Sequence, residues 1–187
     1  MALGLIIGVA VLVLVVIAIG YFFAIYNSLV MLKNQIEKAW SNIDAMLQQR
    51  YNEITKLFEA AKGAMKHEKE TFTLVTQARN AYASAKTMGE KAKADNMMEG
   101  ALKSLFAVVE SYPTLKANEN VLQLQQRITQ VEDMITDRRE FYNDSVYTFN
   151  TRIEQIPYVI VANMLKYTKK ELFKAEEKAK KDVEIKF

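Results

Sequence analysis

The sequence predicts an all-α protein in which an N-terminal transmembrane helix continues into a long antiparallel bundle of three or four helices. Three observations predict this fold class. A long apolar run opens the chain, and no charged side chain precedes Lys33. Between Tyr26 and Phe187, only three glycines and two prolines can interrupt a helix. Apolar residues in this region recur at steps of three and four, the period of a helix face. We therefore expect a transmembrane anchor over residues 1–26 and a helical bundle over residues 27–187.

The apolar run from Ala2 to Tyr26 is long enough to cross a membrane, because a helix needs roughly 20 residues to span about 30 Å of hydrocarbon. Aromatic residues gather at its C-terminal end, as they do at membrane–water interfaces: Tyr21, Phe22, Phe23 and Tyr26. A cleaved signal peptide would have a basic start, a shorter apolar core and a small-residue cleavage site. No Lys or Arg precedes this run, and Tyr-Phe-Phe stands where Ala-x-Ala is required. The prediction is an uncleaved anchor.

Basic residues after the span predict its orientation. Lys33, Lys38 and Arg50 follow the apolar run, and no basic side chain precedes it. The positive-inside rule then places the body in the cytoplasm and the N-terminus outside, in a single-pass protein of the inner or plasma membrane. Gly4 and Gly8 form a G-x-x-x-G pair that could bring two spans together, although glycines also occur in spans without such a role.

The first bundle helix is expected to continue the span without a break to about Lys62, where Gly63 offers a stop. Its apolar face has the spacing of a coiled coil, with Arg50 at one seam position. Trp40 belongs to this face, so we interpret it as a packing residue rather than a membrane anchor. The face comprises Ile36, Trp40, Ile43, Leu47, Ile54, Leu57 and Ala61.

A second helix is expected to begin near Glu68, because carboxylates suit the first turn of a helix. Its apolar stripe is Phe72, Val75, Ala78, Tyr82 and Ala85. The polar stretch from Thr87 to Asn96 contains Gly89 and is expected to be either a bend or a solvated helix. The next helix should end at Tyr112-Pro113, since proline disfavours helical geometry in the residue before it. Its stripe is Met97, Met98, Ala101, Leu102, Leu105, Phe106 and Val109.

Another helix should begin at a cap provided by Asn118 or Asn120. Its stripe is Val121, Leu124, Ile128, Val131 and Ile135, and after a change of phase at Arg138 and Arg139 it continues with Tyr142, Val146, Phe149 and Ile153. Pro157 breaks or begins the last helix, whose apolar residues are Ile160, Val161, Met164, Leu165, Leu172 and Phe173. The tail from Lys174 to Lys186 is expected to fray, and Val183 to Phe187 to be extended.

Several sequence blocks occur in one order along nearly the whole chain. They are Tyr26-Asn27, Lys33-Asn34-Gln35, Ala39-Trp40-Ser41-x-Ile43-Asp44, His67-Glu68-x-x-Thr71, Thr76-x-Ala78-Arg79, Tyr112-Pro113-x-Leu115-Lys116-Ala117-Asn118, Tyr142-Asn143-x-x-Val146-x-x-Phe149-Asn150 and Ile156-Pro157. In these blocks the chain resembles the LemA family of bacterial membrane proteins, to which magnetosome-membrane relatives also belong. The resemblance implies a single N-terminal anchor and a helical-bundle body, and no established biochemical activity. The segment from Asn52 to Leu57 departs from the family pattern because it lacks a proline, which favours a straighter first helix.

Composition predicts neither an enzyme nor a cofactor or metal site. The chain has no cysteine, so disulfides, zinc–thiolate sites and thiol nucleophiles are excluded. Its one histidine, His67, adjoins Glu68, and neighbours on a helix do not face each other. A formal net charge of +3 with interleaved signs is too mild for a nucleic-acid footprint.

Four arginines lie on or beside apolar stripes: Arg50, Arg79, Arg138 and Arg139. They either bind a ligand or a lipid phosphate, or pair inside the bundle with Asp44, Glu132, Asp137 or Glu140. We favour internal pairing, because a lone buried charge is prohibitive.

The functional hypothesis that these features favour is a membrane-anchored scaffold or interaction protein. Its expected partners are the lipid bilayer, a second copy of the chain, and a membrane or cytoplasmic protein. The alternatives are a protein that remodels or senses the membrane, and a bundle that binds a ligand or a metal ion. Carboxylate-bridged metal bundles need Glu-x-x-His pairs on two helices, which a single histidine cannot supply.

Overall fold

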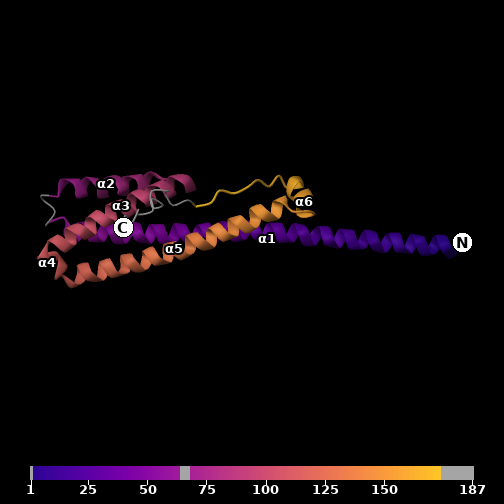
Figure 1. The fold of residues 1–187 in the computed structure, drawn as a ribbon, viewed down its shortest axis with the longest axis horizontal. Helices are drawn as coiled ribbons and strands as arrows, with labels where there is room; N and C mark the ends of the chain where they lie inside the picture. The colour runs from indigo at the N-terminus through magenta and orange to yellow at the C-terminus, as the bar shows by residue number, and fades with distance from the viewer. Residues whose placement is uncertain (1, 64–67, 174–187) are drawn as a thin grey trace, which may run out of the picture. The chain divides into compact units, whose positions relative to one another are not determined.

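The computed structural model describes residues 2–63 and 68–173. These residues form six helices and no strand: α1 (Ala2–Ala61), α2 (Lys69–Ser84), α3 (Met88–Ser111), α4 (Pro113–Lys116), α5 (Glu119–Glu154) and α6 (Tyr158–Met164) (Figure 1). The all-α prediction is confirmed. The predictions for His67, for the tail from Lys174 to Lys186 and for its end from Val183 lie outside the described residues.

The chain divides into two compact units, to both of which α1 and α5 contribute. The first unit comprises residues 1–41 and 140–172, and the second comprises residues 42–139 and 173–187. The predicted boundary between an anchor over residues 1–26 and a bundle over residues 27–187 stays a prediction.

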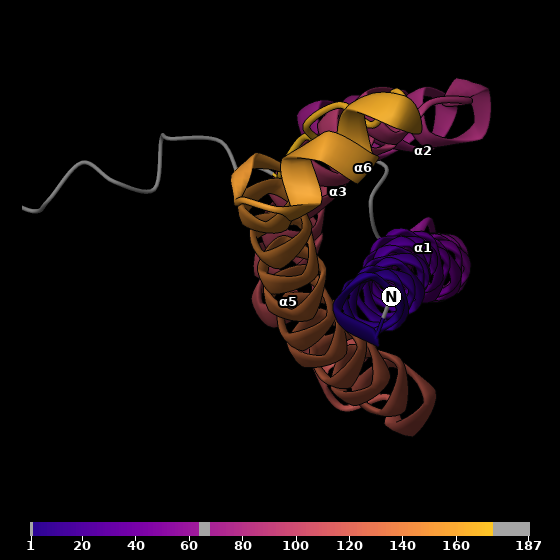
Figure 2. The same cartoon turned by 90° about the vertical axis from the view of Figure 1, so that its right-hand side faces the viewer.

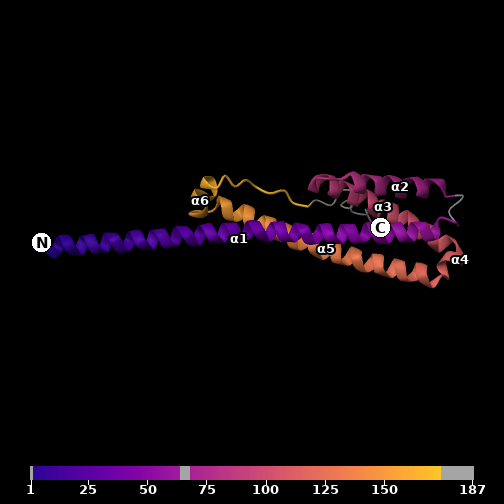
Figure 3. The same cartoon turned by 180° about the vertical axis from the view of Figure 1, so that it is seen from behind.

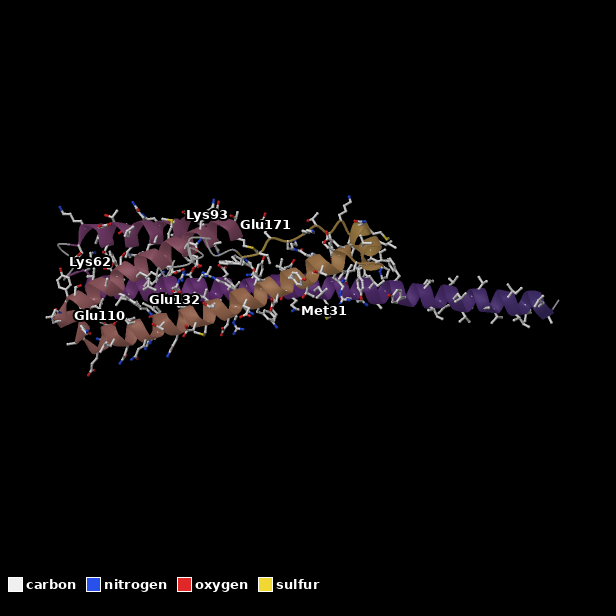
Figure 4. All side chains as sticks on the ribbon, viewed as in Figure 1. Met31, Lys62, Lys93, Glu110, Glu132 and Glu171 are labelled. Carbon is white, nitrogen blue, oxygen red and sulfur yellow. The ribbon has the colours of Figure 1, made fainter. Side chains whose placement is uncertain are left out.

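Helix α1 is unbroken from Ala2 to Ala61, as the absence of glycine and proline between Gly20 and Gly63 predicts. Its opening residues are exposed through Ala24, apart from half-buried Phe22. Figure 4 shows the N-terminal part of this stretch with its side chains projecting from the helix and no other element beside it. The most apolar 18-residue window of α1 has a mean hydropathy of 3.3 and no buried residue. In the part of the chain that the structure describes, α1 is the one helix long and apolar enough to cross a membrane.

In the first unit, α5 runs beside α1 in the opposite direction (Figures 1 and 3). Gln35 Nε2 donates a hydrogen bond to Ser145 Oγ at 3.3 Å. The rings of Trp40 and Tyr142 meet edge to face, with centroids 6.1 Å apart. Trp40 is therefore a packing residue, as predicted. The predicted seam of this part of α5 is buried: Tyr142, Val146, Phe149 and Ile153.

In the second unit, the end of α1 packs with α2, α3 and the start of α5, and successive long helices alternate in direction (Figure 1). The predicted seam of α1 is buried here from Ile43 to Ala61. On α5, Val121, Ile128 and Val131 are buried as predicted.

The predicted stripes of α2 and α3 need correction at their edges. Phe72 is 39% exposed and Met97 is 45% exposed, while Thr71 and Val108 are buried instead. Phe72 still contacts the core with one side of its ring, 5.1 Å from the ring of Phe58. Each misplaced residue lies one position from a buried one, so the helix period was right, and the errors lie at the edges of the buried face.

The polar stretch from Thr87 to Asn96 is the beginning of α3, after a bend at its N-terminal end. Thr87 Oγ1 accepts a hydrogen bond from the Glu90 N–H at 3.2 Å, and Glu90 Oε2 accepts one from the Thr87 N–H at 3.0 Å. This reciprocal capping box satisfies two N–H groups that the helix itself leaves unpaired. Bonds from the backbone N–H groups of Lys86 and Thr87 lower the pKa of Glu90.

Helix ends elsewhere follow the predicted signals. Tyr112 closes α3 and Pro113 is the first residue of α4. Between the two predicted caps of α5, the structure selects Asn118, whose Oδ1 accepts hydrogen bonds from the N–H groups of Asn120 and Val121.

The prediction for the last helix was too long. Helix α6 ends at Met164, and Lys166 has a φ of 54°, in the left-handed region. The Lys166 N–H donates to the Asn163 carbonyl and the Tyr167 N–H to the Ala162 carbonyl, which is the Schellman pattern of helix termination. The residues predicted as one apolar face therefore separate: Val161 and Phe173 are buried, while Ile160, Met164 and Leu172 are exposed.

Loss of the capping box should weaken the second unit. Thr87→Ala removes the acceptor for the Glu90 N–H, so we expect the free energy of unfolding to fall by about 1 kcal/mol. Thr73→Ala is the matched control, because the Thr73 hydroxyl donates only to the Lys69 carbonyl within α2. Chemical denaturation in detergent, followed by circular dichroism, measures both; equal stability of the two variants would contradict a stabilising role for the cap.

Candidate functional site

Four charged side chains from three helices meet inside the second unit, and we call them the charge cluster: Arg50 on α1, Asp95 on α3, and Glu132 and Arg139 on α5. Arg50 Nη1 lies 2.7 Å from Glu132 Oε1 and 2.9 Å from Glu132 Oε2. Arg50 Nη2 donates to the Asp95 carbonyl oxygen at 3.0 Å and also contacts the Asp95 carboxylate. The other carboxylate oxygen of Asp95 pairs with Arg139. One guanidinium thus joins α1 to both α3 and α5.

Two members of the charge cluster, Arg50 and Asp95, are shielded from water, whereas the two members on α5 are partly exposed. Side-chain exposure is 2% for Arg50 and 0% for Asp95, but 29% for Glu132 and 17% for Arg139. Figure 4 labels Glu132, one of these two members, on α5. The guanidinium of Arg139 lies over the ring of Phe173, 4.8 Å from its centroid.

The formal charges of the cluster cancel, because two arginines face two carboxylates. A buried charge is tolerated when it is paired and hydrogen-bonded. Here each arginine has a carboxylate partner and each carboxylate has an arginine. The cluster therefore presents no uncompensated positive charge to a phosphate or to another anion.

The structure separates the four arginines that the sequence grouped together. Arg50 and Arg139 share Asp95, whereas Arg79 lies over the Phe58 ring at 5.5 Å and 3.7 Å from Glu59 Oε1. Arg138 is exposed. Of the predicted acidic partners, Glu132 pairs with Arg50, while Asp44 pairs with Lys91.

Sequence reasoning missed Asp95, the most buried member of the charge cluster. Asp95 lies in the stretch that was expected to be a bend or a solvated helix. A signal was present, because Asp95 precedes Met98 by three residues and Leu102 by seven, which puts it on the apolar stripe of α3. A carboxylate on such a stripe needs a cationic partner from another helix.

A second polar group lies between α1, α2 and α3 of the same unit. The rings of Tyr51 and Tyr82 stack with centroids 5.1 Å apart, and Lys91 pairs with Asp44. These residues line or adjoin an open pocket. Burial, and secondarily the nearby Asp44 carboxylate, raises the pKa of Tyr82 from 10.0 to about 12. At neutral pH the Tyr82 hydroxyl is therefore a hydrogen-bonding group and not a base.

Metal-binding side chains do not gather in the described structure. Within residues 2–63 and 68–173, no three His, Asp or Glu residues lie close enough to hold a metal ion.

Comparison with known proteins finds similarity to one family. The model of the LemA family matches residues 39–187. Protein LemA of Metamycoplasma hominis is 30% identical over 177 residues, which cover 90% of this chain and 80% of that protein. Magnetosome protein MamQ 2 of Paramagnetospirillum magneticum is 34% identical over 80 residues, and magnetosome protein MamQ of Magnetospirillum gryphiswaldense is 31% identical over 80. Each of these two alignments covers 43% of this chain and only 29% of the MamQ protein.

Removal of Arg50 should be strongly destabilising. Arg50→Met leaves Glu132 without a partner and Asp95 with Arg139 alone, so we expect a loss of about 3–5 kcal/mol in the free energy of unfolding. The matched control is Arg138→Met, an exposed arginine on α5, which should change stability by less than about 0.5 kcal/mol. Urea denaturation in detergent compares them, and a wild-type midpoint for Arg50→Met would mean that the cluster does not bind the helices together.

Tyr82 should make the second unit sensitive to alkali. Because the folded state raises the pKa of Tyr82, its contribution to stability is complete below pH 10.0 and is lost as the pH rises toward about 12. Over this range, the free energy of unfolding should fall less in Tyr82→Phe than in the wild type. Tyr147→Phe, at a side chain that is 70% exposed, should keep the wild-type pH dependence. Parallel loss of stability in all three proteins would assign the effect to other groups.

Proposed function

The chain belongs to the LemA family, and we propose that it is a single-pass membrane protein whose helical bundle acts as a scaffold or interaction module at the membrane surface. One observation carries this proposal: α1 is a single helix whose start is apolar and exposed on all sides and whose remainder carries a buried seam. The first part suits a lipid environment and the second part suits the interior of a protein.

The exposed start of α1 favours insertion in a bilayer over exposure to water. Removing apolar surface from water gains about 25 cal/mol per Å², so a run of exposed Leu, Ile and Val side chains is costly in solution. Soluble proteins rarely expose apolar patches of this extent, and such patches mark contact with a membrane or a partner. Lys33 and Lys38, beyond the span, support an orientation with the N-terminus outside and the bundle in the cytoplasm.

A scaffold role is supported by the continuity of α1 and by the neutrality of the charge cluster. No glycine or proline interrupts α1 after Gly20, so the bundle is joined to the span by a helix without a hinge. The four charges of the cluster are used in joining α1, α3 and α5. We therefore assign the cluster a structural role and propose that partner proteins bind elsewhere on the bundle.

Self-association is part of the proposal. Gly4 and Gly8 lie one turn apart on the exposed span, and a Cβ atom added at either glycine would meet no atom within 4 Å. The two glycines leave a shallow face on which the backbone of a second span can lie closely.

Blocking this face should dissociate the oligomer. Gly4→Ile combined with Gly8→Ile adds side chains where the second span would lie, so we expect native mass spectrometry in detergent to show oligomers of the wild type and monomers of the variant. Gly20→Ile is the matched control, because Gly20 also has no neighbour within 4 Å but lies about 120° around the helix from Gly8. A wild type that is only monomeric would overturn self-association. Dissociation by Gly20→Ile as well would remove the case for the paired glycines.

A further inference from the structure

We propose that the corner between α5 and α6 is a second membrane-contact site, which lies on the surface of the bilayer that α1 crosses. The site belongs to the first unit alone and depends on the proposed anchoring by α1. Its occupant is the lipid headgroup and upper acyl region, and its contacting residues are Ile156, Ile160 and Met164.

The corner lies at the level where the predicted span ends. Gln35 of α1 is hydrogen-bonded to Ser145 of α5, and the two helices run in opposite directions. Glu154, the last residue of α5, is nine residues beyond Ser145, and Tyr26 is nine residues before Gln35. Because both helices rise by about 1.5 Å per residue, α5 ends opposite Tyr26. The Trp40–Tyr142 ring contact gives nearly the same level.

The residues at this level are unusually exposed for apolar side chains. Ile156 is 85% exposed, the largest value for a large apolar residue in the described structure. Ile160 and Met164 are 61% and 65% exposed and lie one turn apart on the same face of α6. The opposite face of α6 is occupied by the protein core, through Val161 and Ala162. Helix α6 is therefore amphipathic, with its outer face uncovered.

The direction of α6 suits a membrane surface. Figure 2 views α1 nearly end-on, and in the same view α6 is seen from its side. Helix α6 thus lies across the direction of α1. If α1 crosses the bilayer, α6 lies along the bilayer surface, which is the position that amphipathic interfacial helices adopt.

Charges around the corner are complementary to anionic lipid. From Arg152 to Lys170 the chain has four basic residues and one acidic residue, Glu154. Arg152 donates to the Tyr158 hydroxyl at 2.9 Å and lies over its ring. Lys166 is exposed two residues after the end of α6. An apolar face bordered by tyrosine and cationic side chains is the composition that membrane interfaces favour.

A bilayer fits this patch better than a second copy of the chain. The exposed apolar part consists of three side chains, whereas a stable protein interface buries about 800 Å² on each partner. A bilayer needs no such area here, because α1 already holds the first unit at the membrane and the corner adds only local contact.

The test uses the full chain in lipid nanodiscs. Because the sequence has no cysteine, single variants carry one environment-sensitive fluorophore each. Ile160→Cys reports on the corner, and Phe23→Cys reports on the span. Tyr147→Cys is the control: Tyr147 is 70% exposed, but by the same register it lies opposite Lys33, about 10 Å beyond Tyr26. The quenchers are phospholipids with a spin label on the upper acyl chain.

We expect these lipids to quench the fluorophore at Ile160→Cys several-fold more strongly than that at Tyr147→Cys, and to quench Phe23→Cys as well. Quenching at Phe23→Cys without quenching at Ile160→Cys would overturn the second contact and leave the anchor intact. A fluorophore at Ile160→Cys that is shielded from water yet not quenched by lipid would assign the corner to a protein partner. Absence of quenching at Phe23→Cys would overturn the anchor, and the second contact with it.

Discussion

Helix α1 must satisfy two environments with one backbone, and the rest of the fold follows from this constraint. Residues 2–24 are exposed apart from half-buried Phe22, so this stretch has no seam buried within the chain. From Ile25 onward the apolar residues narrow to one seam, and each unit must bury its own part. The first unit does so chiefly with one long partner, α5. The second unit uses α2, α3 and the start of α5.

A seam of apolar residues leaves the register of the helices poorly defined, because a shift by one heptad places similar side chains in similar positions. The charge cluster removes this freedom in the second unit. In the observed register of α1 against α3 and α5, Arg50 reaches both Asp95 and Glu132. Replacing all members of such a network by apolar residues is often neutral for stability. We infer that the cluster favours the observed register of the helices, because a shifted register would bury charged side chains without partners.

The sequence was most informative where one side chain decides the local structure. The break at Pro113 could be assigned from the residue alone, and the cap of α5 could be narrowed to Asn118 or Asn120. The partner of Arg50 on α3 was missed, because Asp95 lies in a mostly polar stretch of the sequence. Its place on the apolar stripe of α3 was the available signal, and the packing of three helices shows that it is buried. The end of α6 was also inaccessible: a lysine in the left-handed region gives no signal, since glycine is the residue that ordinarily marks this position.

In the first unit, apolar side chains are exposed both at the start of α1 and at the corner between α5 and α6. Water around the whole unit does not explain this exposure. In water, exposure of Ile156 is unfavourable for the same reason as exposure of Leu12. Both are accounted for by the proposed membrane span: Leu12 lies within it, and Ile156 lies at the level of Tyr26, where we propose that it ends. One bilayer with its surface at Tyr26 accounts for the exposed residues both at the start of α1 and at the corner between α5 and α6. A protein bound at the corner accounts for the corner alone.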